Sequence, residues 1–160
     1  DPSRVNEGRV SIEIEGSSIR NAGAVSGFED VAANVWLGAS MLLEDRLPTV
    51  GNYKLRIRNS RIEGAGRSGL EFGDLSLLSE GQPEESEYDV VLRGNTITNN
   101  GEAEVMIYAP NARIDAQGNC WGRLEGLSEN RVAVLYPAEA SQLDAKEHIS
   151  CQEQPSGALK

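Results

Sequence analysis

The fold is decided by one stretch of sequence, Val90-Val91-Leu92-Arg93-Gly94-Asn95-Thr96-Ile97-Thr98-Asn99-Asn100-Gly101. It begins with the apolar Val90-Val91-Leu92, a Gly-Asn turn follows Arg93, and Ile97 comes five positions after Leu92. The segments 11–21, 54–64 and 113–122 carry the same order of apolar and turn residues. Four matching segments indicate an internal repeat. In a common register the paired apolar positions are Ile14 and Ile19, Ile57 and Ile62, Leu92 and Ile97, and Ala116 and Trp121.

Each repeat predicts two strands separated by a turn. The first has the period of two that is typical of a strand with one buried face, as in Ile12-Glu13-Ile14-Glu15. A second alternating pair begins eight residues after Ile62 and again eight residues after Ile97. The expected inward pairs of this second strand are Val35/Leu37, Leu70/Phe72, Val105/Ile107 and Val132/Val134.

The spacing of the repeats predicts parallel pairing. Ile57 lies 43 positions after Ile14, Leu92 lies 35 after Ile57, and Ala116 lies 24 after Leu92. Strands that return at such distances cannot pair through tight hairpins, so each is expected to pair in parallel with its equivalent one coil away. The sequence therefore predicts an all-β parallel solenoid. Insertions are expected at 23–30 with 44–52 and at 78–87, and only 141–149 has a helical pattern.

Composition limits the class of protein and its partners. The chain has 160 residues, 15 Lys and Arg, 25 Asp and Glu, and a net charge of −10, which excludes the basic footprint of a nucleic-acid-binding protein. Hydrophobic residues make up 39% of the chain, so disorder over its whole length is excluded. The longest apolar runs, such as 132–136, fall short of the roughly 20 residues that span a bilayer, and we expect no membrane insertion.

The two cysteines, Cys120 and Cys151, lie 31 positions apart and fit no zinc-finger or CxxC spacing. A single disulfide is the simplest pairing, and it would stabilise the fold by roughly 3 to 4 kcal/mol in the loop-entropy model. Two free thiols in a reducing compartment are the alternative. A disulfide favours a secreted, periplasmic or cell-surface location.

The segments 90–101 and 112–122 resemble the right-handed parallel β-helix repeat family, within the pectate-lyase-like superfamily. The second segment looks like the asparagine-tryptophan-tryptophan-glycine coil found near the end of such domains, with Cys120 in place of the first tryptophan. The resemblance covers about residues 10–136. It implies a short right-handed parallel β-helix of about four coils, with a lead-in at 1–9 and a C-terminal cap and flexible tail at 137–160. The family includes polysaccharide lyases, glycoside hydrolases, epimerases and many proteins of other or unknown activity.

The outward positions of the first strand form three columns across the coils. Adjacent coils lie about 4.8 Å apart, so the charged residues of a column are neighbours. One hypothesis is that Arg56, Arg58 and Arg93, with Glu13, Glu15 and Trp36, bind a glycan, because arginine offers a fork of donors to carboxylates and hydroxyls. The alternative is a solvated ladder of ion pairs, each worth roughly 0 to 1 kcal/mol. Its expected pairs are Glu13 with Arg56, Glu15 with Arg58, and Asp89 with Arg113.

The two tryptophans differ in register. Trp121 takes an inward position, whereas Trp36 lies between Val35 and Leu37 and should point outward. Trp36 is therefore a candidate platform for stacking a sugar, and the alternative is that it packs under the insertion at 44–52.

Other polar residues are expected to serve the structure. Asparagines at the corners tolerate left-handed backbone and bond to neighbouring turns. His148 lacks a neighbouring Ser or Cys pattern for a catalytic triad, and the columns hold no Ca²⁺-type cluster of acids. The carboxylates of the pairs Glu84/Glu85 and Glu102/Glu104 are expected to be solvated. The corner asparagines are Asn59, Asn95, Asn99 and Asn119.

These observations favour a secreted, non-catalytic β-helix module that acts as a scaffold or binds a glycan or cell surface, with no cofactor and no metal. A carbohydrate-active enzyme of the lyase or hydrolase class, or its terminal coils, is the alternative. Residues 1–8 are short and polar for a cap. We therefore expect the chain to be the C-terminal part of a longer β-helix, or its first coil to pack against a partner protein or a second copy.

Overall fold

The computed structural model describes residues 8–22, 33–38, 51–73, 86–122, 132–134, 142–147, 149 and 151. Within these ranges all the regular structure is β-strand and no helix occurs. Every strand pair is parallel, and the strands form three sheets. The predicted all-β class and parallel pairing are confirmed.

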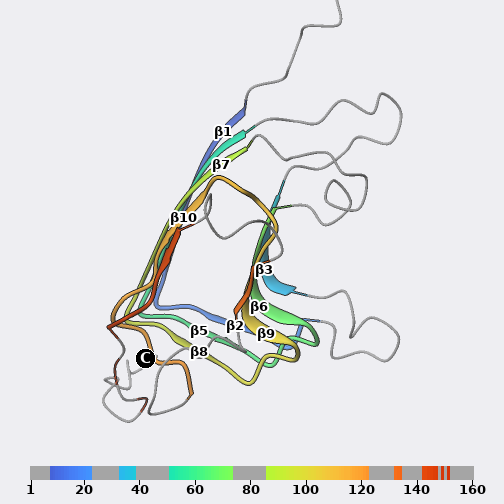
Figure 1. Cartoon of the computed structure of the whole chain (residues 1–160). Coiled ribbons are helices and arrows are strands. Elements are labelled where there is room, and N and C mark those ends of the chain that lie inside the picture. Colours follow the sequence, from blue (N-terminus) through green and yellow to red (C-terminus); the bar gives the residue numbers. More distant parts are fainter. Residues whose placement is uncertain are drawn as a thin grey trace, which may run out of the picture.

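The chain visits the three sheets in turn, and each visit adds one strand beside the previous one. Figure 1 shows the sheets as three sides around a common interior, with β1, β7 and β10 on one side, β5 and β8 on the second, and β6 and β9 on the third. The five-stranded sheet contains β1 Gly8–Glu15, β4 Gly51–Arg58, β7 Glu87–Arg93, β10 Ala112–Asp115 and β12 Gln142–Asp144. The three-stranded sheet contains β2 Ser18–Arg20, β5 Arg61–Glu63 and β8 Thr96–Thr98. The four-stranded sheet contains β3 Ala33–Leu37, β6 Ser68–Phe72, β9 Ala103–Ile107 and β11 Val132–Val134.

The predicted register is confirmed in all three sheets. Ile14 pairs with Ile57 and Ile57 with Leu92 in the five-stranded sheet. In the four-stranded sheet, Leu70 pairs with both Val35 and Val105. The side chains of Ile57, Leu92, Leu70 and Val105 are fully buried, so the alternation places aliphatic columns of both sheets in the interior. Trp121, predicted to face inward, is 3% exposed and belongs to the same core.

The corners between the five-stranded and three-stranded sheets are built from two kinds of residue. Some adopt a left-handed backbone conformation, and others form hydrogen bonds to the neighbouring coil. Asn59 and Gly94 occupy equivalent corners with φ of 49° and 63°, a region where asparagine and glycine are favoured. The next polar position holds Ser60, Asn95 and Asn119, whose side chains are buried. Asn95 Oδ1 accepts from the Ser60 N–H at 2.9 Å, and Asn119 Oδ1 accepts from the Asn95 N–H at 2.9 Å. The prediction of structural corner asparagines is confirmed at these positions.

A helix over 141–149 was expected, and this prediction is wrong for Gln142–Asp144, which form β12 instead. This strand pairs with β10, and the chain beyond it continues along the preceding coil, where the N–H of Ala116 donates to the Asp144 carbonyl at 2.7 Å. The backbone groups of the β10 edge thus receive partners that a helix could not supply. A fifth strand therefore lies on the sheet within the range expected to be the cap.

The disulfide between Cys120 and Cys151 is present, with 5.1 Å between the two Cα atoms, and the alternative of two free thiols is wrong. It joins the corner of the fourth coil to the chain that follows β12. The N–H of Ile149 donates to the Asn119 carbonyl at 3.1 Å close to this bond. The bond thus fixes the end of the fifth coil against the fourth. The expected insertions at 23–30, 44–52 and 78–87 lie outside the described residues, except where β4 and β7 begin.

Candidate functional site

The five-stranded sheet presents the predicted columns of charged residues on its outer face. Glu13 pairs in register with Arg56, Arg56 with Val91, Val91 with Asp115, and Asp115 with Asp144. The columns are therefore as predicted, with β12 adding a fifth member. The side-chain partners within them differ from the predicted ion pairs.

Arg56 forms its ion pair with Asp89 of the neighbouring column, with 2.8 Å between Nη2 and Oδ2, and its Nη1 donates to the Asp89 carbonyl at 2.8 Å. The expected pairs of Arg56 with Glu13 and of Asp89 with Arg113 are not formed between these described side chains. The physical reason is reach, because a guanidinium extends past the residue directly opposite and meets a carboxylate and a carbonyl together.

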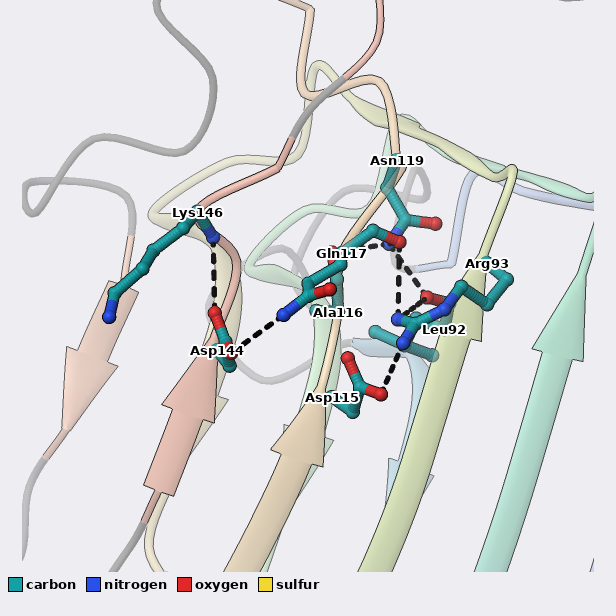
Figure 2. A network of polar contacts seen from close by, with 8 residues as sticks. All are labelled: Leu92, Arg93, Asp115, Ala116, Gln117, Asn119, Asp144 and Lys146. Atoms are coloured by element: carbon teal, nitrogen blue, oxygen red, sulfur yellow. Dashed lines mark hydrogen bonds and ion pairs between the residues drawn. The ribbon is translucent and has the colours of Figure 1, made fainter.

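Arg93 is the centre of a second network, drawn in Figure 2. One of its nitrogens forms an ion pair with Asp115, and Nη1 donates to the Gln117 carbonyl at 3.2 Å. Gln117 in turn donates from Nε2 to Asp144 Oδ2 at 2.7 Å, so three coils are linked. The hydrogen bond from Arg93 holds the pKa of Asp115 below its ordinary value. This network engages Nη1 and Nη2 of Arg93 within the chain.

The other charged residues that were predicted to bind a glycan, Glu13, Glu15 and Arg58, are exposed. Glu13, Glu15 and Arg58 take part in no ion pair with another described residue, and the predicted pair of Glu15 with Arg58 is not formed. Of the three arginines proposed for this face, the structure thus leaves Arg58 with its charge unpaired among the described residues, while Arg56 and Arg93 are neutralised by Asp89 and Asp115.

Two hollows lie on this sheet. The first, with a volume of about 170 Å³, lies at the start of the strands, where Tyr53 and Tyr88 stack with ring centroids 5.0 Å apart. The second follows β7, β10 and β12 beside the network of Figure 2. Both are lined by groups of either sign, so neither concentrates one charge. The first is lined by Asn52, Tyr53, Lys54, Glu87, Tyr88, Asp89, Asn111 and Arg113.

Trp36 points outward from β3 as predicted, and 51% of it is exposed. Its indole Nε1 donates to the Gly73 carbonyl at 3.0 Å, which ties one edge of the ring to the next coil. The alternative, that Trp36 packs under the insertion at 44–52, concerns residues outside the described ranges. In the register of the four-stranded sheet, Trp36 lies opposite Glu71 and Glu71 lies opposite Met106. An exposed aromatic ring of fixed orientation thus borders a carboxylate.

Glu71 belongs to a buried polar cluster on the outer face of the four-stranded sheet, which the sequence reasoning missed. It is 5% exposed, accepts from the Tyr108 hydroxyl at 3.2 Å, and lies 3.4 Å from Arg67 Nε. Arg67 also lies over the Tyr108 ring and donates to its hydroxyl, and it reaches Glu102 at 3.7 Å. Burial raises the pKa of Glu71 although Arg67 opposes the shift. Burial and the neighbouring Glu71 also raise the pKa of Tyr108.

Glu104 lies on the same face and corrects another expectation. It was expected to be solvated, yet it is 4% exposed and accepts a hydrogen bond from Asn100 Nδ2. Asn100 in turn accepts from the Ala65 N–H at 3.0 Å and from Asn34 Nδ2 at 3.2 Å. The alternation of 103–107 correctly places Glu104 outward, but nothing in the sequence signals that this outward face is covered. Glu102, the other residue of the Glu102/Glu104 pair in the sequence, is exposed, as expected.

The described residues contain no group of three or more His, Cys, Asp or Glu side chains that could hold a metal ion. His148, Glu84 and Glu85 lie outside the described residues. Among the described segments, none is a helix of the length and hydropathy needed to cross a membrane. No protein-family model, curated protein or solved structure matches the chain significantly.

Proposed function

We propose that this chain is a right-handed parallel β-helix module that binds a polysaccharide on an outer face and performs no chemistry itself. Three parallel sheets visited in turn support the architecture, and right-handed crossovers are the general rule for parallel strands. The disulfide supports an oxidising location such as the cell surface or the periplasm. In such a location polysaccharides are abundant ligands.

The observation that carries the proposal is the exposed and anchored ring of Trp36. Free aromatic side chains on a surface lose rotational freedom when a ligand stacks on them, and this cost is reduced where a hydrogen bond already fixes the ring. The Gly73 carbonyl supplies that bond. By contrast, Arg56 and Arg93 already form ion pairs with Asp89 and Asp115, which makes the five-stranded sheet the weaker candidate for the glycan.

The test is a binding assay with polyuronates and neutral glucans. Binding is measured by retardation in affinity electrophoresis and by the change in tryptophan fluorescence. Trp36→Ala is expected to abolish retardation, since Trp121 is buried and cannot replace it. Arg58→Ala reports on the five-stranded sheet, and Arg61→Ala, which removes another exposed arginine from the three-stranded sheet, is the control. Retardation that survives Trp36→Ala but is lost in Arg58→Ala would move the ligand to the five-stranded sheet and overturn the assignment to Trp36.

A carbohydrate-active enzyme is the second candidate, and the observation that favours it is Glu71. Burial raises the pKa of the Glu71 carboxyl, which favours the protonated form that a general acid needs, and Trp36 lies beside it in register. Incubation with the same polysaccharides would then yield unsaturated products or new reducing ends, and Glu71→Gln would abolish them. Binding without turnover supports the non-catalytic module instead.

A further inference from the structure

The first coil of the chain, made of β1, β2 and β3, lies at one end of all three sheets. Within the described ranges, no strand pairs with its outer edge. The longest of these edges is β1, a strand of eight residues whose free side presents the backbone N–H and C=O groups of alternate residues. A long unpaired edge is a template for pairing with another strand.

The apolar side chains of this end are incompletely covered. Ile12 and Ile14 are only partly buried, whereas Leu55 and Ile57, which they meet in the next coil, are 1% and 0% exposed. Val10 at the start of the same strand is 41% exposed. The aliphatic interior thus opens outward along the inward column of β1, beside a strand edge that has no partner among the described residues.

The sequence of β1 is complementary to itself when two copies run antiparallel. With Ile12 opposite Ile12 on a twofold axis, Arg9 lies opposite Glu15 and Val10 lies opposite Ile14. Residues directly opposite each other share a face, so each apolar residue meets an apolar one and each arginine meets a carboxylate. The symmetry repeats both pairs, which yields two Arg9–Glu15 contacts. Arg9 and Glu15 are exposed in the single chain, and both face outward with Glu13.

A second copy would otherwise continue the stack head to tail, with β12 of one chain on β1 of another. That contact offers only the three residues of β12 against the eight of β1. Antiparallel pairing of two β1 strands instead uses residues 9–15 of both copies.

We propose that two copies of this chain associate head to head through β1, with an antiparallel β1–β1 pair centred on Ile12, so that the two five-stranded sheets become one continuous sheet. The dimer covers Val10, Ile12 and Ile14 of both copies and leaves the Trp36 face of the four-stranded sheet on the outside of each. The proposal stands independently of the ligand that Trp36 binds.

The first test is a charge exchange read by analytical ultracentrifugation over a range of concentrations. Arg9→Glu alone and Glu15→Arg alone each place like charges opposite one another twice, so each is expected to weaken the dimer by about tenfold or more. The double variant Arg9→Glu/Glu15→Arg restores the pairs and the affinity. Arg113→Glu makes the same charge change on β10, away from the edge, and leaves the affinity unchanged. Thermal unfolding confirms that each variant is folded.

The second test reports the register directly. Ile12→Cys places two thiols across the twofold axis, and mild oxidation is expected to give a covalent dimer on non-reducing electrophoresis. Ile14→Cys is the control, since Ile14 faces Val10 of the other copy and cross-links poorly.

Three results would overturn the proposal. A chain that stays monomeric at concentrations up to about 1 mM leaves an upstream coil of a longer chain as the occupant of this edge. Oligomers that grow beyond the dimer indicate stacking of β1 on β12. A dimer that is indifferent to the charge exchange indicates another interface.

Discussion

Asn95 supports the corner between the five-stranded and three-stranded sheets, and replacing it with alanine tests whether the buried ladder of corner side chains holds the coils together. The Asn95 side chain is fully buried. Its Oδ1 accepts from the Ser60 N–H at 2.9 Å, and its Nδ2 donates to the Ile57 carbonyl and to Asn119 Oδ1, each at 2.9 Å. Asn95→Ala removes all three bonds and leaves the backbone unchanged.

The expected cost follows from what each partner retains. The buried Ser60 N–H loses its acceptor, which costs about 1 to 3 kcal/mol, and the bond to the Ile57 carbonyl contributes about 1 kcal/mol more. Asn119 Oδ1 keeps the Asn95 N–H as a donor and adds little. We therefore expect Asn95→Ala to lower the free energy of unfolding by about 2 to 4 kcal/mol, a large part of the roughly 5 to 15 kcal/mol that folded domains possess.

Urea unfolding followed by circular dichroism, with the disulfide oxidised, measures this change. Asn59→Gly is the matched control. Asn59 lies at the corner of the neighbouring coil, at the position equivalent to Gly94. It is exposed and has a φ of 49°, which glycine adopts freely. Its effect should stay within about 0.5 kcal/mol. A cost of Asn95→Ala below about 1 kcal/mol, or one equal to that of the control, would refute the view that the ladder bonds hold this corner.

The other predictions concern the disulfide, Glu71 and the surface ion pairs. Replacing Cys120 and Cys151 with serine should lower the free energy of unfolding by about 3 to 4 kcal/mol, and a reducing agent should lower the melting temperature of the wild type but not of the variant. Burial raises the folded-state pKa of Glu71 above its ordinary value of 4.5, so the stability it contributes is complete below that value and is lost as the pH rises through the folded-state pKa. Glu71→Gln should therefore become more stable relative to wild type in thermal melts as the pH rises above 4.5, and a constant difference would contradict the assignment. A double-mutant cycle of Arg56→Ala with Asp89→Asn should give a coupling below about 1 kcal/mol that shrinks in salt, whereas a larger coupling would show that this exposed pair is a structural clamp.

Periodicity predicted the register of the sheets closely, because inward residues recur at fixed offsets within each coil. It placed Ile14, Ile57 and Leu92 in one column, and the structure confirms it. It failed where the outcome depends on a neighbouring coil. The helical pattern of 141–149 is overridden at β12 because the edge of β10 offers backbone partners to an extended strand.

Side-chain partners and burial on the outer faces were the least predictable features. Arg56 forms its ion pair with Asp89 and not with Glu13, because a long side chain reaches several acceptors on the neighbouring strands. The register alone does not say which of them it binds. Glu71 and Glu104 lie at outward positions of their strands. The sequence pattern around them is the same as that around an outward residue exposed to solvent. The local sequence pattern does not distinguish an outward face that is buried from one that is exposed to solvent.

The sequence by itself determined which residues face inward, where the corners lie and which strand returns beside which, because a period of two and the backbone preferences of glycine and asparagine are local properties. Only the tertiary structure decided that Arg56 and Arg93 form ion pairs with aspartates, that Glu71 and Glu104 are buried, and that β1 has an apolar edge to which no described strand is paired. Each of these depends on what lies across the next coil or at the end of the stack, and that is fixed by packing in three dimensions and not by neighbours in the chain.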